Sequence, residues 1–219
     1  MSIKNGGGKL PAPSPAAPLV KWVVTAMAAH ILPERLAIAE GRRKILRSQA
    51  TAFLVGGFLL GSGLFAWDRW PLGLLLGLIY SNAFEYFTHR VLLHGTTGNL
   101  HRAHERHHET WGQPEEALYV RFGPPLAVVL LLVGNSIPLV FLDRLGAGIG
   151  GGALLAFVAY YVLYEEFHWR IHLGCLPRWL AGLRRHHFAH HKGHAGKYNV
   201  LAPLLDRLLD AGQVLRPKP

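Results

Sequence analysis

Long runs of apolar residues separate polar segments over most of the chain. Three runs contain 20 or 21 residues without Asp, Glu, Lys, Arg or His, and a fourth contains 15 before Glu85, although its apolar helical pattern continues to Leu92. A helix needs about 20 apolar residues to cross a bilayer. The pattern therefore predicts an all-α integral membrane protein with four transmembrane helices, at 48–67, 70–84, 122–142 and 145–164.

The four runs form two pairs. Asp68 and Arg69 separate the first two runs, and Asp143 and Arg144 separate the last two. Short charged links between apolar runs predict tight turns at the membrane surface, and therefore two helical hairpins. A soluble all-α bundle with buried helices is the alternative, but four such runs would leave it little polar surface.

The first 47 residues have a different character from the rest. Residues 1–18 are rich in Gly, Pro, Ala and Ser and predict a disordered tail. Residues 19–47 predict amphipathic helices that lie on the membrane surface, with Pro33 ending or kinking the first of them. Residues 48–219 are then expected to form a single membrane domain.

Composition and charge support a membrane location. Only 16% of the residues are charged, against roughly 25% in soluble domains. Lys and Arg number 23 and Asp and Glu 13, and only Arg69 and Arg144 of the basic residues lie in the predicted turns. The positive-inside rule therefore places the other polar segments in the cytoplasm, at a bacterial inner membrane or the endoplasmic reticulum. The basic residues are expected to meet lipid headgroups, and they form no nucleic-acid surface.

Histidine is the residue type that points to chemistry. The 14 His outnumber the acidic residues, and the single cysteine, Cys175, excludes a Cys-rich metal site, so histidine would have to bind any metal. All His except His30 fall in two blocks, which follow the second and fourth apolar runs. Because both predicted hairpins return to the same side there, the fold is expected to bring the blocks together.

The spacing of these histidines suits metal binding. His168 and His172 are four residues apart and share a helix face, as do the members of two H-x-x-H-H triples. His89 and His94 are five residues apart, which places them about 140° apart on a straight α-helix. Both can serve one site only if the helix ends between them or they flank the site, and Gly95 favours a helix end there.

Together the blocks supply ten candidate ligands, which suits two metal ions with about five ligands each. Imidazole ligands favour iron, zinc, copper or nickel and argue against magnesium and calcium. Zinc binds nitrogen sites more tightly than ferrous iron and could therefore occupy such a site in purified preparations, but it has no redox chemistry, so oxygen chemistry would require iron as the functional metal. The candidates are His89, His94, His104, His107, His108, His168, His172, His187, His190 and His191.

At its histidine motifs the chain resembles the fatty acid hydroxylase superfamily of membrane di-metal oxygenases, which includes sterol desaturases and fatty-acid 2-hydroxylases. The later Tyr198 and Asn199, and L-D-R-L at 205–208, are also similar to that family, and the resemblance covers about 50–210. The histidine motifs are H-R-V-L-L-H at 89–94, H-E-R-H-H at 104–108, H-W-R-I-H at 168–172 and H-F-A-H-H at 187–191.

The resemblance implies an oxidoreductase in which the ten histidines hold two metal ions and O2 is used to hydroxylate a C–H bond of a membrane lipid, either a fatty acyl chain or a sterol-like molecule. It implies no catalytic residue beyond the metal ligands. The chain leaves no room for a fused haem domain, so electrons are expected from a separate cytochrome- or ferredoxin-type protein.

Two other functions remain open. The same di-metal site could desaturate a lipid or sterol, or hydroxylate a carotenoid. The non-enzyme alternative is a metal-binding membrane protein, such as a sensor or a transporter. A transporter would need ionisable residues along a path through the membrane, and the deep parts of the four runs contain none.

Four polar residues are expected to support the ligands. A ligating imidazole usually bonds a carboxylate or a carbonyl through its other ring nitrogen. Glu85 lies four residues before one candidate ligand and Glu165 three residues before another, and Asn82 and Asp206 are further candidates for this role. The alternatives are that Glu85 and Glu165 face water at the cytoplasmic boundary and that Asp206 forms a salt bridge with a neighbouring Arg.

Aromatic residues gather at the end of the fourth run. Tyr160, Tyr161, Tyr164, Phe167 and Trp169 are expected either to line an entrance for an acyl chain or to form an aromatic belt at the membrane surface.

Two further histidines lie next to the motifs. His101 and His186 could replace His104 and His187 as ligands if the register shifted, but the family pattern places both outside the ligand set.

Overall fold

The computed structural model describes residues 16–95, 97–193 and 197–214. Within these residues there are helices and loops and no strand, which confirms the all-α prediction. The α-helices are α1 (Ala16–Gly61), α2 (Trp70–Phe87), α3 (Asn99–Glu109), α4 (Pro125–Arg144), α5 (Gly150–Leu173), α6 (Ala181–His191) and α7 (Leu204–Val214). A π-helix, η1 (Thr88–Leu93), continues α2, and two short 3-10 helices are η2 (Glu116–Leu118) and η3 (Arg178–Leu180).

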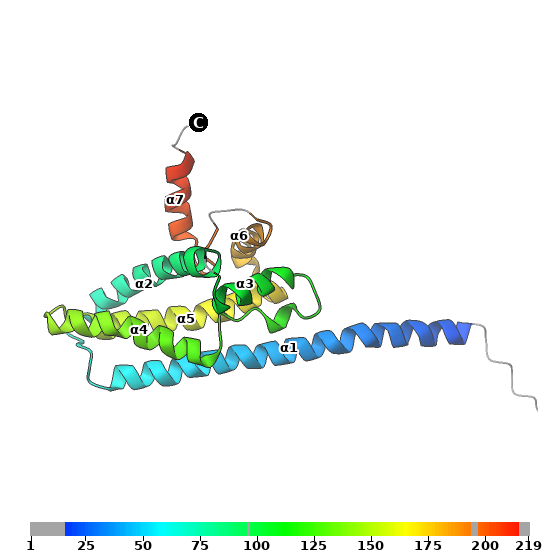
Figure 1. The fold of residues 1–219 in the computed structure, drawn as a ribbon, viewed down its shortest axis with the longest axis horizontal. Coiled ribbons are helices and arrows are strands. Elements are labelled where there is room, and N and C mark those ends of the chain that lie inside the picture. Colours follow the sequence, from blue (N-terminus) through cyan, green and yellow to red (C-terminus); the bar gives the residue numbers. More distant parts are fainter. Residues whose placement is uncertain (1–15, 96, 194–196, 215–219) are drawn as a thin grey trace, which may run out of the picture.

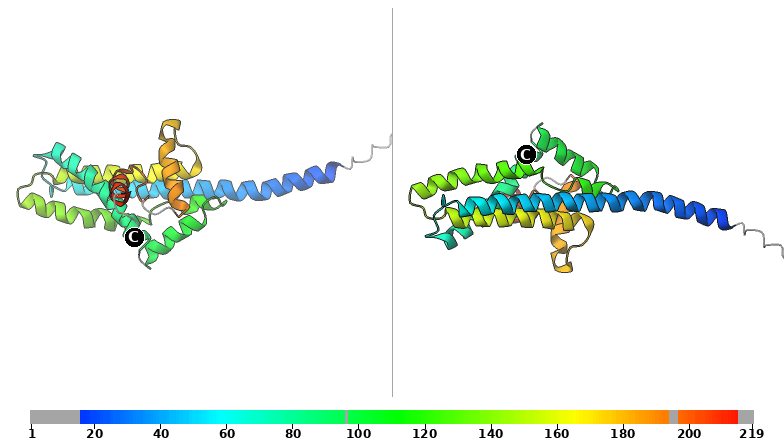
Figure 2. Two further views of the ribbon diagram at one scale, coloured as in Figure 1. Left: turned by 90° about the horizontal axis from the view of Figure 1, so that it is seen from above. Right: turned by 90° about the horizontal axis from the view of Figure 1, so that it is seen from below.

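Four helices form an elongated bundle, and the short helices lie at one end of it. α5 is central and contacts α1, α2 and α4. The fully buried Ala52 of α1, Leu132 of α4 and Leu154 of α5 belong to its core. Figure 1 shows the four helices running roughly along the long axis, with α1 extending well beyond the others. α3 and α6 cross one end of the bundle and project on opposite sides of it (Figure 2).

α1 is longer than the sequence pattern predicted. It runs without interruption from Ala16 to Gly61, so the predicted helix end at Pro33 is corrected. A proline inside a helix removes one backbone hydrogen bond, and the bonds on either side of this position keep α1 helical. Residues 16–18 of the predicted tail belong to α1, and the rest of that tail lies outside the described residues.

The links between paired helices are also longer than the predicted two-residue turns. Residues 62–69 connect α1 to α2, and residues 145–149 connect α4 to α5. The carboxylate of Asp143, near the end of α4, accepts hydrogen bonds from the backbone N–H of Ala66 at 2.8 Å and of Gly150 at 3.0 Å. Asp143 therefore caps the first turn of α5 and joins the two links, instead of forming a turn.

α2 packs chiefly against α5, and not against α1 as a simple hairpin would require. Small residues allow the close approach. A Cβ added at Gly73 of α2 would overlap the carbonyl oxygen of Ile149, and one added at Gly152 of α5 would overlap that of Trp70. Small residues at such contacts are typical of helices that pack within membranes. The approach places Thr88 and His89 of η1, at the end of α2, around the same cavity as Tyr160 and Tyr164 of α5.

We expect Gly152→Ala to destabilise the protein by about 1–3 kcal/mol, because its methyl group would force two backbones apart. The matched control is Gly134→Ala on α4, where an added Cβ meets nothing within 4 Å and the better helix former should be neutral or stabilising. Thermal unfolding of the detergent-purified variants measures both effects. Equal stability of the two variants would contradict the close α2–α5 contact.

Large apolar side chains cover the outside of the bundle. Leu54 and Phe58 on α1 are each 75% exposed, and Leu126 and Ile137 on α4 are exposed to a similar degree. An apolar surface of this extent indicates contact with lipid or with another protein. Of the helices in the described part of the chain, α4 is the one that is long and apolar enough to cross a membrane by length and composition.

Candidate metal centre

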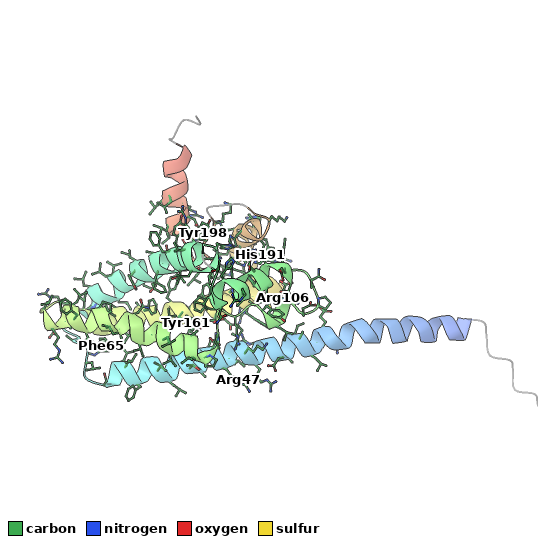
Figure 3. All side chains as sticks on the ribbon, in the orientation of Figure 1. Arg47, Phe65, Arg106, Tyr161, His191 and Tyr198 are labelled. Carbon is green, nitrogen blue, oxygen red and sulfur yellow. The ribbon has the colours of Figure 1, made fainter. Side chains whose placement is uncertain are left out.

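The histidine-bearing elements η1, α3, α5 and α6 meet at one end of the bundle. Figure 3 places His191 of α6 and Arg106 of α3 at this end, whereas Phe65 marks the opposite end. The two sequence blocks of histidines are therefore side by side, as expected from the order of the apolar runs.

Nine of the ten candidate ligands form two compact groups, in each of which the ligand atoms lie within 4.8 Å of one another. The tenth, His191, lies beside the second group, with its Nε2 3.1 Å from Nε2 of His187. Cluster 1 comprises His89, His94, His104, His108 and His190, and cluster 2 comprises His107, His168, His172 and His187.

His89 and His94 reach the same cluster by a route that the sequence analysis did not anticipate. α2 continues beyond Phe87 as the π-helix η1, which ends at Leu93, and this confirms the helix end expected beside Gly95. The N–H of His94, the C-cap residue, bonds the carbonyl of His89 at 3.2 Å. This bond spans five residues, as in a π-helix, so the two rings stack with centroids 5.2 Å apart. The π-helical turn, which the sequence did not predict, thus removes the separation of about 140° that a straight α-helix would impose.

Each H-x-x-H-H triple divides between the two clusters. On α3, His104 and His108 belong to cluster 1, while His107 belongs to cluster 2. Residues four apart on an α-helix differ by about 40° and residues three apart by about 60° in the opposite direction. The i,i+4 pair therefore faces one cluster and the i+3 residue faces the other. On α6 the assignment is reversed, with His187 in cluster 2 and His190 in cluster 1.

The Nε2 atoms converge in both clusters. Nε2 of His104 lies 3.0, 2.9 and 3.0 Å from Nε2 of His89, His94 and His108. A neutral imidazole has one N–H group, so these contacts cannot all be hydrogen bonds, and several lone pairs face one another. A cation among them would remove that repulsion.

In cluster 2, Nε2 of His187 has the corresponding position, 3.1, 2.8 and 3.1 Å from Nε2 of His168, His172 and His191. Nitrogens bound to one metal are about 2.9 Å apart when at right angles and about 3.3 Å apart in a tetrahedron. The observed separations suit the right-angled positions of a five- or six-coordinate ion.

Burial also fits these residues for metal binding. It lowers the pKa of His107, His168 and His187 well below the ordinary value, and the neighbouring imidazoles lower it further. Burial lowers the pKa of His108 to about 4. The rings are therefore neutral at physiological pH, which is the form that binds a metal. Both nitrogens of His107 are buried without a hydrogen-bond partner in the described structure, and a metal would supply one.

Two groups outside the clusters orient ligands. Nδ1 of His89 donates to the carbonyl of Tyr198 at 2.5 Å, and Nδ1 of His172 donates to the carboxylate of Glu116 at 2.5 Å. Each bond leaves the lone pair of Nε2 facing its cluster. Glu116 was not predicted, since it lies in a loop region where no periodicity relates it to His172. Only the packing of η2 against α1 and α5 brings it there.

Glu85 has a different role from the expected one. Its carboxylate contacts no histidine of the described structure but accepts hydrogen bonds from Tyr160 Oη at 2.6 Å, Asn199 Nδ2 at 3.1 Å and the N–H of Val200 at 2.5 Å. A buried carboxylate at the end of α2 therefore holds the segment that follows α6. This corrects the expectation that Glu85 orients His89.

Glu165 is likewise corrected. It is fully buried and accepts hydrogen bonds from Ser48 Oγ at 3.0 Å, Tyr161 Oη at 2.8 Å and the N–H of Phe122 at 3.3 Å. It thus joins α1, α5 and the start of the α4 region. On α5 it lies three and seven residues before His168 and His172 and so shares their helix face, but its hydrogen-bond partners come from other segments and from Tyr161.

Asn82 and Asp206 support the site through the backbone. Asn82 Nδ2 donates to Tyr160 Oη at 3.0 Å and to the carbonyl of Ala202 at 2.6 Å. Asp206 accepts from the N–H groups of Tyr198 and Asn199, each at 2.9 Å. The carbonyl of this same Tyr198 bonds His89, so Asp206 positions a ligand indirectly.

The two additional histidines lie outside the clusters. His101 bonds the carbonyl of Leu93 through Nδ1 at 2.7 Å, and Nε2 of His186 lies 2.8 Å from a carboxylate oxygen of Asp206. Each supports a neighbouring backbone segment, and neither takes the place of His104 or His187.

An apolar cavity, here called the inner pocket, connects the bundle to cluster 1. It extends between α2, α4 and α5, and His89 forms part of its wall. Tyr160, Tyr161 and Tyr164 line it as well. Its lining residues are Ser81, Phe84, Glu85, Thr88, His89, Leu93, Phe122, Leu131, Phe157, Tyr160, Tyr161 and Tyr164.

The remaining two aromatic residues have other positions. Trp169 packs in a separate core cluster with Ile45, Ala117 and Val120, on the side of α5 that faces α1 and η2. Phe167 is half-buried and is not among the residues that line the inner pocket. The expected lining role is therefore corrected for both residues, because their positions on α5 turn them away from α2.

A second, polar cavity, here called the metal-side pocket, adjoins the first. Leu93, Phe122 and Tyr164 line both cavities, so the two share a wall. The metal-side pocket also has walls from His104 of cluster 1 and His107 of cluster 2. An apolar molecule in the inner pocket would therefore lie against residues that also border the cavity beside the two clusters.

Replacing Glu116 by alanine should weaken metal binding at cluster 2 by about 10–100-fold, because His172 loses the partner that fixes its ring. The metal content of the purified protein should fall towards one ion per chain at chelator concentrations that leave two in the wild type. Glu115→Ala, at the neighbouring position, is the matched control. Equal chelator sensitivity of both variants would contradict the role of Glu116.

The comparisons with known proteins agree with this geometry. A family profile described as "Fatty acid hydroxylase" matches residues 74–211. The chain is also 29% identical over 131 residues to "Fatty acid 2-hydroxylase" of Macaca fascicularis, an alignment that covers 55% of this chain and 33% of that protein. The chain thus spans about a third of the length of this relative. No solved structure matches it. Because the matched region contains both histidine clusters and covers more than half of the chain, the protein belongs to the fatty acid hydroxylase family.

Proposed function

We propose that this chain hydroxylates a C–H bond of a fatty acyl lipid at a pair of histidine-bound metal ions. The observation that carries the proposal is that histidines of the clusters line two adjoining cavities. The apolar inner pocket reaches His89, and the metal-side pocket that adjoins it reaches His104 and His107. The family and the name of the relative support an acyl chain as the substrate.

Iron is the metal that we propose for both clusters. When bound, a pair of redox-active ions supplies the activation of O2 that an unactivated C–H bond requires, and zinc has no such chemistry. The overall reaction inserts one oxygen atom of O2 into the C–H bond. The second oxygen atom is reduced to water by two electrons from a donor, with uptake of two protons. We propose a separate cytochrome- or ferredoxin-type protein as that donor.

The residues of the inner pocket would hold the chain and exclude water. The hydroxyl of Tyr160 donates to Glu85 and that of Tyr161 donates to Glu165. Because these hydroxyls already have partners, the rings present apolar surface to the pocket. A methylene chain can therefore lie against them without leaving a buried polar group unpaired.

We also propose that the outer faces of α1, α2, α4 and α5 lie in the bilayer, with the clusters at its cytoplasmic surface. The exposed apolar side chains on these helices and the distribution of Lys and Arg support this arrangement. A lipid would then reach the pocket from the membrane. Arg184, Arg185 and Lys192 lie near cluster 2 in the sequence and would attract an acidic electron donor.

Comparison of lipids from expressing cells tests the function. Cells with the wild-type protein should contain a lipid heavier by one oxygen atom, and cells with His187→Ala plus His190→Ala, which removes one ligand from each cluster, should lack it. His101→Ala plus His186→Ala is the matched control, since these histidines lie outside the clusters. A product lighter by two hydrogen atoms would instead identify a desaturase, and no product with iron and a donor present would overturn the proposal.

A further inference from the structure

A third cavity lies further from the metal clusters. It is a groove between α2 and α4, with α5 beneath it, and its walls are almost entirely apolar. We call it the outer groove. Its lining residues include Leu76 and Tyr80 of α2, Asn135 and Leu139 of α4, and Ala153 and Phe157 of α5.

Aromatic rings separate the outer groove from the inner pocket. Phe157 lines both cavities. Its ring meets that of Phe84 edge to face at 5.3 Å between centroids, and the ring of Tyr80 lies 5.8 Å from Phe84 and 5.9 Å from Phe157. These three residues, Tyr80, Phe84 and Phe157, form what we call the aromatic barrier.

A hydrogen bond fixes one member of the barrier. The hydroxyl of Tyr80 donates to Oδ1 of Asn135 at 2.5 Å and so connects α2 to α4 across the groove. Nδ2 of Asn135 donates to the carbonyl of Leu131 on its own helix, at 2.7 Å. In apolar surroundings Oδ1 would lack a partner if the ring of Tyr80 turned away. The bond therefore holds the barrier closed.

We propose that the aromatic barrier sets the length of acyl chain that the enzyme accepts, and that the outer groove is the space into which longer chains would extend. This inference rests on the proposed function. A chain with its reacting carbon beside His104 and His107 would run through the inner pocket towards Phe157. Its last carbons would meet the barrier, so Phe157 and Tyr80 are specificity-determining residues.

Replacing residues of the aromatic barrier by smaller ones should shift the hydroxylated products towards longer acyl chains. One methylene that does or does not fit an apolar pocket changes kcat/KM by about tenfold or more. Cells that express Phe157→Leu or Tyr80→Ala and receive an equimolar mixture of fatty acids should therefore show a ratio of long to short hydroxylated chains raised about tenfold over the wild type. Phe141→Ala on α4, which is 64% exposed and lines neither cavity, is the matched control.

A binding measurement separates this inference from the proposed function. A fluorescent polyene fatty acid bound to the purified protein is displaced by saturated fatty acids of increasing length. The length at which displacement is strongest should increase in Phe157→Leu and Tyr80→Ala but not in Phe141→Ala. If the wild type makes no hydroxylated lipid, the proposed function fails, and the displacement series still tests the barrier. Unchanged length preference in both barrier variants with wild-type metal content would overturn the inference, leaving the groove a surface for bilayer lipid.

Discussion

Replacing His187 by alanine should reduce the bound metal from two ions per chain to one. Nε2 of His187 lies within 3.1 Å of the Nε2 atoms of three other histidines, so it is the central ligand of cluster 2. Because the two clusters use separate sets of side chains, cluster 1 should keep its ion. Hydroxylation should fall by more than about 100-fold, which exceeds the effect of removing a group that only orients a ligand.

His186→Ala is the control for this experiment. It removes the same side chain from the neighbouring position, where the ring contacts Asp206 and no histidine of either cluster. It should retain two ions and most of the activity. Elemental analysis of the purified proteins gives the metal content, and product analysis gives the activity. Two ions in His187→Ala, or equal losses in both variants, would contradict the assignment of cluster 2.

Replacing Glu85 by alanine should release metal from cluster 1 and destabilise the fold, although Glu85 contacts no histidine of the described structure. The change leaves the hydroxyl of Tyr160, the amide of Asn199 and the N–H of Val200 without their acceptor. Each buried donor left unpaired costs about 1–3 kcal/mol. The segment that these bonds hold includes Tyr198, whose carbonyl fixes the ring of His89. Cluster 2 does not use this segment and should keep its ion.

Two variants make the test specific. Glu109→Ala removes a carboxylate whose side chain is 63% exposed and should leave metal content and stability unchanged. Glu85→Gln keeps one acceptor oxygen and should show a smaller loss than Glu85→Ala. Thermal unfolding and metal analysis of the purified proteins are the measurements. Retention of both ions and of wild-type stability in Glu85→Ala would show that the segment does not depend on this carboxylate.

Loss of a different metal ion in each of the two variants would distinguish the clusters. His187→Ala should lose the ion of cluster 2, and Glu85→Ala that of cluster 1. One remaining ion in each single variant, and none in the double variant, would demonstrate two independent sites. Loss of both ions from either variant would mean that the clusters bind cooperatively.

The sequence alone determined the helical class, the set of ten candidate ligands and their division between two blocks. Apolar runs and histidine spacing are local patterns, and a helix converts spacing directly into a shared face. The order of runs and blocks was enough to place the blocks side by side. Ligand spacing also indicated two ions, with about five histidines for each.

The tertiary structure decided which histidine joins which cluster. The i+3 residue of each triple faces away from the i,i+4 pair, so His107 and His190 belong to clusters different from those of their neighbours. Spacing within one helix does not reveal which partner helix each face will meet. The π-helical turn that aligns His89 with His94 was likewise hidden, because apolar periodicity does not distinguish it from an α-helix.

The partners of the buried carboxylates also depended on tertiary structure. Glu85 and Glu165 precede ligands by one helical turn, which favoured a direct contact, but their bonds go to segments far away in the sequence. Glu116, which does orient a ligand, is 56 residues from His172. A buried carboxylate binds whichever donors the packing of other segments brings to it. Local sequence therefore determined which residues are candidate ligands, whereas long-range packing determined which groups hold them in place.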